Sequence, residues 1–500
     1  MIGSRWVFLL LISLLGLSAR GSLTTFDILV LNAEHLFDVD GDALFSDFSP
    51  DKYGPGQVLT KVRHIAEIVA AAGEGQGAEI ILFQEFEVDQ TPGPGRLDPE
   101  SFLERYAAVP LVDMLREPLD PEIRNLPVEA FVLKALAEAG LGPYDIRVSD
   151  YRADPTGRTI AHKNVVFSQL PIEESRTLPT DGARGILEVV VLAGDSRLHL
   201  FNNHWKSGAG DAELEKIRVG NARVLRERLD EIFAADPLAD VVVGGDFNSQ
   251  YDQKLRYPAM TRTALNDELG SQGNEAAMLD LKGPDLYNLW YELSPDQRGS
   301  DTYRNEWGTL MHLIVSRGLY ERRGVTYIDN SFRVIRLPGR NADPVTGTPI
   351  RWHATRESGY GYTDHLPIAA RFAFPEAPAP SWIDLTNPGT EELTPRVRPA
   401  VSPEQVGGLP ESRRLLDTGL LGFSFRLKAE VAALNPLSVR RGDEVVAVWI
   451  PNPGLREQML SVWKPGEPVE IVATLGYYRD AWQLVIESPD WILSEAAAAR

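Results

Sequence analysis

The chain has 500 residues, of which 43% are hydrophobic and 24% are charged, and it contains no cysteine. This composition is typical of a folded protein with two or three domains and excludes a largely disordered chain. Without cysteine, disulfides, thiolate metal sites, a cysteine nucleophile and a lipoprotein anchor are excluded. The net charge of −21 argues against broad adhesion to nucleic acid or anionic membranes but allows a local basic groove.

An apolar run, WVFLLLISLLGLSA, occupies residues 6–19 and follows Arg5. It is too short and too close to the N-terminus for a typical membrane span, and it indicates a secretory signal peptide over residues 1–21. An exported protein without disulfides suits the bacterial periplasm or the surrounding medium. We therefore expect a periplasmic or secreted protein with no stable membrane anchor.

The next part of the chain alternates between strand-like and helix-like segments. Strands are expected at 24–37, 78–87, 197–205 and 240–248, and amphipathic helices at 59–72 and 212–233. This alternation predicts an α/β layered domain over residues 22–374. Residues 92–145 open with TPGPG and then read mostly as helix, so we interpret them as an insertion between strands.

The sequence changes character from about residue 373. Residues 375–415 are rich in proline and are interpreted as a linker. Residues 416–500 contain several β-rich runs and one short helical piece at about 454–463, a pattern that resembles an OB-like small barrel. A small β domain of another topology is the alternative.

Polar side chains end four of the predicted strands, and open α/β sheets bind ligands beyond the carboxyl ends of their strands. These side chains are Asn32, Glu85, Asn203 with His204, and Asp246 with Asn248. A fifth polar pair, Asp364 and His365, lies in GYTDHLPIA. Each residue alone is more often a turn former or a helix cap than a ligand, so the grouping carries the prediction.

Six segments, taken in order, resemble the motifs of the endonuclease/exonuclease/phosphatase superfamily, which includes pancreatic deoxyribonuclease and the abasic-site endonucleases. They are LNAEHLFD, ILFQEFE, NNHWKSG, VVVGGDFNS, WGTLMHLIVS and TDHLPI. The resemblance covers about residues 24–374, and two of the segments look most like a secreted bacterial nuclease-like branch. It implies a four-layer α/β/β/α sandwich that hydrolyses phosphodiesters or phosphomonoesters.

The resemblance also implies roles for individual residues. Glu85 would be the principal ligand of Mg²⁺ or Mn²⁺, with Asp364 and Asn32 completing or supporting the shell of oxygen ligands. Asp246 would orient or deprotonate the attacking water, and Asn248 would hold the nucleophile or a phosphate oxygen.

The two histidines would grip the phosphate, with one of them acting as general acid or base. These are His204 and His365, and Asn203 and Lys206 would bind substrate beside them. One departure concerns Met311, which occupies the position where the family carries an aspartate that orients the second histidine. A thioether cannot fix an imidazole.

Three explanations of Met311 remain open. Another carboxylate takes over, with Asp301, Glu306 and Asp329 as candidates; or His365 works unassisted; or the enzyme is weakened.

The sequence leaves three candidate functions. The favoured one is a secreted nuclease whose OB-like domain offers aromatic residues to bases. The alternatives are a phosphatase or lipid phosphodiesterase and a catalytically reduced binding protein. The aromatic residues of the OB-like domain that could stack on bases are Trp482, Tyr477 and Tyr478. They are equally suited to the core of that domain.

Overall fold

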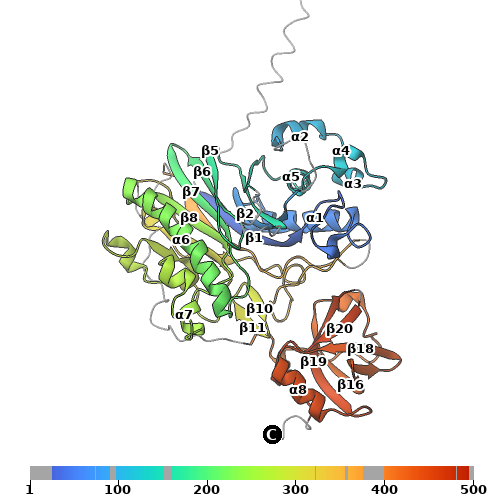
Figure 1. The fold of residues 1–500 in the computed structure, drawn as a ribbon. Helices are drawn as coiled ribbons and strands as arrows, with labels where there is room; N and C mark the ends of the chain where they lie inside the picture. Colours follow the sequence, from blue (N-terminus) through green and yellow to red (C-terminus); the bar gives the residue numbers. More distant parts are fainter. Residues whose placement is uncertain are drawn as a thin grey trace, which may run out of the picture.

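The computed structural model describes residues 25–73, 75–89, 97–150, 160–320, 323–354, 358–375, 399–479 and 481–494. The predicted signal peptide and most of the predicted linker lie outside these ranges. Among the described residues, no helix has both the length and the apolar composition needed to cross a membrane. Figure 1 shows a large layered domain and a smaller barrel at one end of it.

Two β-sheets form the centre of the layered domain. The first has the order β13 (Thr326–Tyr327), β15 (Ile368–Ala373), β1 (Thr25–Leu36), β2 (Ile80–Glu87), β4 (His162–Ser168) and β3 (Asp145–Val148), and β14 (Arg333–Val334) also pairs with β15. The second has the order β5 (Ile172–Leu178), β6 (Ile186–Ala193), β7 (Ser196–His204), β8 (Asp240–Asp246), β12 (Met311–Ser316) and β9 (Leu286–Asn288). Because β1 runs parallel to β2, and β7 to β8, the strands of each pair end at the same edge.

Strand β1 shows how the sequence places a sheet between two cores. Phe26, Ile28 and Val30 face the second sheet, whereas Leu29 and Leu31 face the helices on the other side. A strand that is buried on both faces needs apolar side chains at nearly every position. The run FDILVL therefore forms a central strand.

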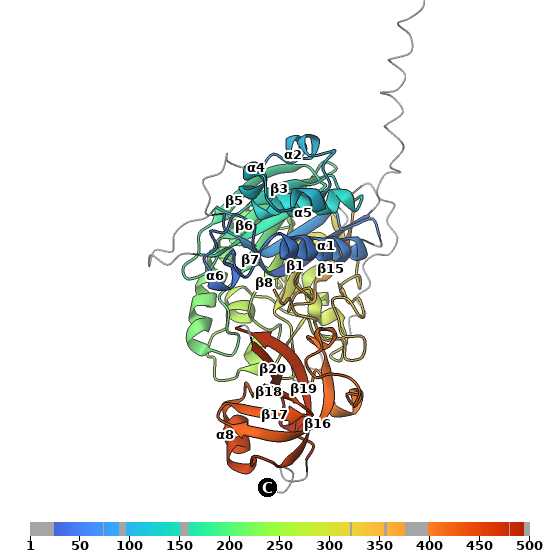
Figure 2. The ribbon, with the colours of Figure 1, turned by 90° about the vertical axis from the view of Figure 1, so that its right-hand side faces the viewer.

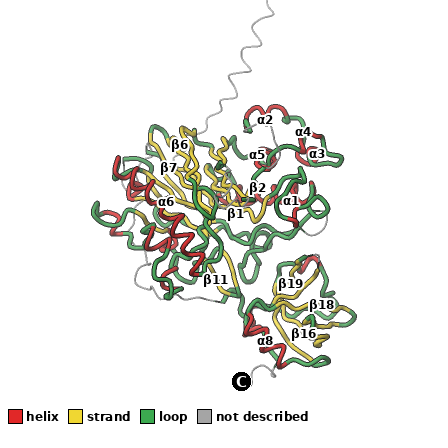
Figure 3. Tube along the Cα trace, in the orientation of Figure 1, coloured by secondary structure: helices red, strands yellow, loops and turns green. Residues whose placement is uncertain are grey.

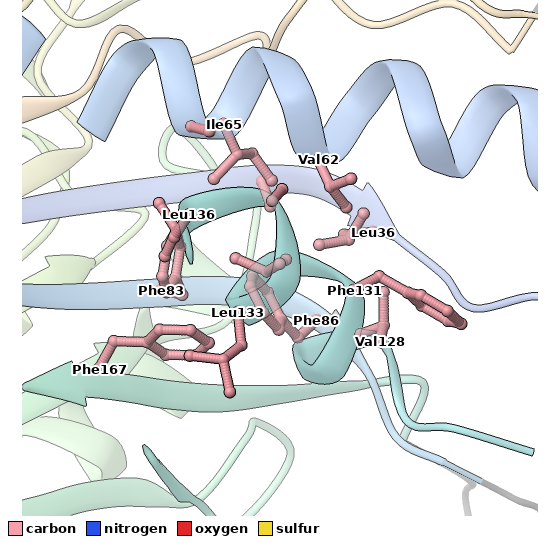
Figure 4. Packing of buried hydrophobic residues seen from close by; sticks show 14 of the residues in the cluster. Leu36, Val62, Ile65, Phe83, Phe86, Val128, Phe131, Leu133, Leu136 and Phe167 are labelled. Atoms are coloured by element: carbon pink, nitrogen blue, oxygen red, sulfur yellow. The ribbon is translucent and has the colours of Figure 1, made fainter. Parts of the chain in front are cut away.

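Helices cover the outer face of each sheet. On the first sheet, α1 (Pro55–Ala72) and α5 (Val128–Glu138) share a core with β2, where Val62, Leu133 and Phe83 lie (Figure 4). On the second sheet, α6 (Ala212–Ala235) packs Leu225 against Val243 and its neighbours. The layers are therefore α/β/β/α, which confirms the fold class predicted from the sequence.

The short helices fill the connections. The predicted helical insertion contains α2 (Pro99–Arg105), α3 (Leu111–Met114), α4 (Pro121–Arg124) and then α5, and α7 (Gln253–Arg256) follows β8. A small hairpin of β10 (Asp301–Tyr303) and β11 (Glu306–Gly308) lies on the side of the layered domain that faces the barrel (Figure 1).

The C-terminal part forms a closed five-stranded barrel, which confirms the predicted small β-barrel. Its strands follow the order β16 (Ser424–Leu434), β17 (Leu437–Arg441), β18 (Glu444–Trp449), β20 (Ala481–Val485) and β19 (Pro468–Tyr478). The helix α8 (Pro453–Val462) separates β18 from β19 in the chain (Figure 3). The side chains of Trp463, Ile471 and Trp491 lie in the core of the barrel.

Candidate active site

Two carboxylates, one from each sheet, meet at the edge where the parallel pairs β1–β2 and β7–β8 end. The side-chain amide of Asn32 bonds to both of them. Glu85 lies near the end of β2, and Asp246 ends β8. The Nδ2 of Asn32, from β1, donates to Glu85 Oε1 at 3.2 Å and to Asp246 Oδ2 at 3.0 Å. The Oδ1 of Asn32 accepts a hydrogen bond from the backbone N–H of Glu34 at 2.9 Å. Three residues that the sequence predicted for the site are thus in direct contact.

Two histidines that the sequence predicted flank this pair. The Nε2 of His204 lies 3.7 Å from both Glu85 Oε1 and Asp246 Oδ2. The Nε2 of His365 lies 3.8 Å from Asp246 Oδ2 and 3.6 Å from Asp364 Oδ1. Within the described residues, the buried Nδ1 atoms of both histidines have no hydrogen-bond partner. Since buried polar atoms are normally bonded, these nitrogens favour a ligand that bonds to them.

The two histidines are held in different protonation states. Burial, the largest effect, lowers the pKa of His204 well below its usual value, so its imidazole is neutral. Burial also lowers the pKa of His365, but the carboxylates around it outweigh burial and raise that pKa to about 9. Burial raises the pKa of Asp246 to about 6. The site thus places a carboxylate able to accept a proton beside an imidazolium able to bind an anion.

Two further histidines lie on the other side of Glu85, and the sequence did not single out either as a site residue. Glu85 Oε2 accepts a hydrogen bond from the backbone N–H of His35 at 3.0 Å and lies 2.7 Å from His35 Nδ1. The same Nδ1 lies 3.1 Å from His162 Nε2. Burial opposes ionisation of Glu85, but the neighbouring histidines outweigh burial and hold its pKa well below the usual value. Glu85 is therefore anionic at neutral pH.

Two overlapping sets of side chains could hold a divalent cation. One set is His35, Glu85 and His162, and the other is Glu85, His204 and Asp246. Within each set the ligand atoms lie within 4.8 Å of one another. Both sets combine carboxylate oxygen with imidazole nitrogen, and both depend on Glu85.

Cationic side chains surround these sets, and they too were not predicted. The Nη2 of Arg184 lies 3.4 Å from His162 Nδ1, and its charge acts on Glu85 and Asp246. Further out, Lys61 Nζ donates to the backbone oxygen of Glu34. In the sequence, a lone arginine or lysine cannot be told from an ordinary surface residue.

Two more predicted residues lie next to these groups, Asp364 partly exposed and Asn248 buried. The Oδ2 of Asp364 lies 3.3 Å from Arg351 Nη2, and its side chain is 31% exposed. Asn248 donates its backbone N–H to Asp246 Oδ1 at 2.9 Å and its Nδ2 to the oxygen of Trp205 at 3.2 Å. Asp364 is in neither cation set, so its role as a metal ligand stays a prediction.

The two predicted substrate-binding residues have different surroundings. Asn203 donates its Nδ2 to two strand carbonyls, at 3.1 and 3.2 Å, and its Oδ1 accepts from the indole of Trp205 at 3.1 Å. These bonds use both protons of its amide, and its binding of substrate stays a prediction. Lys206 follows β7 and is partly exposed. Its binding of phosphate stays a prediction.

The backbone is strained where the site is built. Four site residues other than glycine adopt positive φ angles between 45° and 63°: Glu34, His35, Glu85 and Asn248. Residues in this region persist where the surroundings over-determine them, and such positions cluster at functional sites. Gly245 has φ +137°, and a Cβ there would lie 2.0 Å from the backbone oxygen of Asn203. Glycine is therefore required for β8 to approach β7 just before Asp246.

Met311 and His365 are not in the relationship that the family motif implies. Met311 is fully buried in the apolar core between the sheets. Asp301 instead forms an isolated β-bridge with His365, and its negative charge helps to raise the pKa of that histidine. Of the other two candidates, Glu306 is exposed, and Asp329 belongs to a separate carboxyl cluster. This arrangement favours the first explanation, substitution by another carboxylate.

Comparison with known proteins supports the resemblance. Residues 174–373 match the model of the Endonuclease/Exonuclease/phosphatase family. Similar solved structures include truncated TDP2 from Caenorhabditis elegans, with 14% identity, coverage of 70% of this chain and 98% of that one, and a TM-score of 0.37. Sphingomyelinase C from Streptomyces griseocarneus has 16% identity, coverage of 69% and 99%, and a TM-score of 0.37. No curated protein matches the chain. The family match confirms that this chain resembles the endonuclease/exonuclease/phosphatase superfamily, as its motifs indicate.

Proposed function

We propose that the protein is an exported, metal-dependent phosphodiesterase that cleaves nucleic acid. The observation that carries the proposal is the convergence of Glu85, Asp246, His204 and His365 at one edge of the two sheets. The match of residues 174–373 to a family of nucleases and phosphatases supports it. Export is proposed from the signal-like segment at residues 6–19 alone.

The residues present fit a divalent cation. Glu85 is anionic, and it forms one set of ligand atoms with His35 and the neutral imidazole of His162, which leaves Asp246 outside that set. Carboxylate oxygens suit both Mg²⁺ and Mn²⁺, whereas an imidazole nitrogen shifts the preference away from Mg²⁺. We therefore expect Mn²⁺ to support the reaction better than Mg²⁺. When bound, the cation would offset negative charge on the phosphate oxygens.

The side chains supply the proton transfer and the phosphate contacts. Asp246 accepts a proton from the attacking water, and its Oδ1 is fixed by the N–H of Asn248. His365, as an imidazolium, binds a phosphate oxygen that gains charge in the transition state. His204 is neutral and offers a second hydrogen bond from its free Nδ1.

The test is hydrolysis by the purified chain and by Glu85→Gln. The wild type is given DNA, RNA, bis(p-nitrophenyl) phosphate, a phosphomonoester and a choline phospholipid, each with Mn²⁺, Mg²⁺ or EDTA. We expect cleavage of nucleic acid and of the small diester with Mn²⁺, and a loss of at least about a hundredfold in Glu85→Gln. Glu213→Gln, at an exposed position on α6, is the matched control and should retain full activity.

Failure would take one of two forms. Hydrolysis that persists in EDTA or in Glu85→Gln contradicts a metal-dependent site at this edge. Cleavage of the phospholipid or the monoester, with DNA and RNA untouched, contradicts the nuclease assignment but leaves the site in place.

A further inference from the structure

A cleft of about 680 Å³ lies between the layered domain and the barrel. One side begins at Glu34 and His35, and His35 Nδ1 is 2.7 Å from Glu85 Oε2. The other side is formed by residues of β18, β19 and β20, strands that lie in the barrel beneath the layered domain (Figure 2). The cleft therefore reaches Glu34 and His35, and through His35 it adjoins Glu85 of the proposed catalytic edge.

The walls of the cleft are tied together at its base. Asn305, in the turn between β10 and β11, donates its backbone N–H to Glu487 Oε2 at 2.9 Å. Its side chain exchanges two hydrogen bonds with the backbone of Val401, at 2.8 and 3.1 Å. The oxygen of Val401 also accepts from the indole of Trp491, in the core of the barrel. The hairpin thus anchors the barrel beside the site.

Exposed aromatic residues gather at this cleft. In the described part of the chain, four Phe, Tyr or Trp side chains are more than a third exposed, and three of them line the cleft. Their exposed fractions are 65% for Tyr303, 46% for Trp449 and 55% for Tyr478. Rings left this open to water in separate elements serve no core and are suited to stack on a ligand.

Each of these rings makes a cation–π contact with an arginine. The guanidinium carbons lie 5.0 Å from the Tyr303 ring for Arg304, 5.1 Å from the Tyr478 ring for Arg479, and 5.0 Å from the Trp449 ring for Arg456. Each guanidinium lies over one face of its ring, so the other face is the one that can stack on a base while the positive charge meets the adjoining phosphate. Arg304 and Arg479 also have positive φ angles, 50° and 47°.

The charge of the cleft differs from that of the whole chain. Four lysine or arginine side chains and three carboxylate side chains line it, whereas the chain carries −21. One of the carboxylates, Glu34, is paired with Arg351 at 3.3 Å. The lining thus carries one more cationic than anionic side chain, which is more favourable to a polyanion than the net charge of the whole chain.

We propose that this cleft binds single-stranded nucleic acid and feeds it to the catalytic edge. The proposal rests on the proposed phosphodiesterase function and names its substrate class. Unpaired bases expose the faces that Tyr303, Trp449 and Tyr478 can stack on, whereas a duplex keeps its bases stacked on one another. The arginines beside the rings contact the phosphates between successive bases.

The experiment measures the affinity of the full chain for short labelled oligothymidylate and oligouridylate by fluorescence anisotropy, in EDTA so that nothing is cleaved. The variants are Tyr303→Ala, Trp449→Ala and Tyr478→Ala. Loss of one stacking contact should weaken binding by about 5- to 150-fold. Tyr478→Phe should bind like the wild type, because stacking needs the ring and not the hydroxyl. Val445→Ala, exposed on β18 outside the cleft, is the matched control.

The rate on bis(p-nitrophenyl) phosphate with Mn²⁺ is measured alongside the binding. In the alanine variants, the loss of oligonucleotide affinity should exceed any change in this rate by at least about fivefold. A wild type that binds the oligonucleotides but never cleaves the small diester contradicts the proposed function and not the cleft. Unchanged affinity in all three alanine variants, or equal loss for duplex and single strands, overturns the cleft proposal. The thymidylate and uridylate arms decide between DNA and RNA.

Discussion

At the scale of single residues, Asp301 is the candidate that could take over from the aspartate absent at Met311. A carboxylate at position 311 would lie in the apolar core between the sheets, whereas the backbone of Asp301, in a neighbouring hairpin, pairs with that of His365, and its charge acts on the imidazole. Its Oδ1 is held by the backbone N–H of Leu310 at 3.0 Å and by the hydroxyl of Ser300 at 3.1 Å. A negative charge that acts on His365 is thus supplied from another element, without a hydrogen bond to the imidazole.

Removal of that charge should change the pH dependence of catalysis. In Asp301→Asn the amide can still accept both hydrogen bonds, but one of the carboxylates that raise the pKa of His365 is gone. His365 is charged below its pKa of about 9, so the wild-type rate should fall as the pH rises through that value. In the variant this alkaline limb should move to lower pH. A pH–rate profile with the small diester, supported by NMR titration of His365, measures the shift, and an unmoved limb would rule Asp301 out.

The buried imidazole of His312 makes the unfolding free energy depend on pH in the acidic range. Its Nε2 donates to the oxygen of Ser249 at 2.8 Å, and its Nδ1 accepts from Asn288 Nδ2 at 3.0 Å. Burial lowers its pKa from 6.5 to about 4 in the folded chain. Between these values the unfolded chain binds the extra proton, so this group makes the fold less stable as the pH falls.

The variant His312→Gln isolates this effect. The wild type should lose about 3 kcal/mol more of its unfolding free energy than the variant as the pH falls from about 6.5 to about 4. Urea unfolding at both pH values measures the difference. Equal losses in the two proteins would mean that His312 is not buried in its neutral form.

At the scale of elements, the hairpin of β10 and β11 serves two sites. One strand brings Asp301 to His365, and the turn brings Asn305 to the barrel. Both strands have only three residues. A movement of this hairpin would therefore change the position of Asp301 beside His365 and the position of Asn305 in the cleft.

Asn305→Ala should loosen the barrel. The substitution removes two hydrogen bonds to Val401, which contribute about 1 kcal/mol each, so the interface should weaken by about 2 kcal/mol. We expect a larger radius of gyration in small-angle X-ray scattering and weaker oligonucleotide binding. Asn274→Ala, at an exposed position, is the control. An unchanged radius and affinity would show that other contacts hold the barrel.

The sequence was informative about elements with strong periodicity and silent about those without it. The apolar runs of β1, β2 and β8 end in Asn32, Glu85 and Asp246, so both the strands and their polar ends could be predicted. His35 could not, because β1 has an irregular register after Asn32 that turns its side chain toward Glu85. The hairpin of β10 and β11 is too short for any pattern, and its contacts are fixed only by tertiary packing.

At the scale of the whole molecule, two opposite electrostatic effects act on a nucleic acid. The charge of −21 repels it at long range, and the arginines of the cleft attract it at contact. Salt screens the long-range effect first, since the Debye length is about 10 Å at about 0.1 M ionic strength.

The association rate of oligothymidylate should therefore rise as sodium chloride is added from low concentration, while the dissociation rate also rises. Stopped-flow fluorescence in EDTA separates the two rates. For most nucleic-acid-binding proteins, which are basic, the association rate falls when salt is added. An association rate that falls steadily with salt would show that the oligonucleotide meets a positive field over most of its approach.

The catalytic edge is assembled from residues that are far apart in the chain. Asn32 in β1 contacts Asp246 at a separation of 214 residues, and β1 pairs with β15 through Thr25 and Ala373. Strand β1 therefore remains without its antiparallel partner until almost all of the layered domain has been synthesised, and the cleft needs the barrel as well. Such long-range pairing is completed late in folding. A chain truncated before His365 and β15 would thus carry Asn32, Glu85 and Asp246 without that histidine and without the strand that closes the first sheet beside β1.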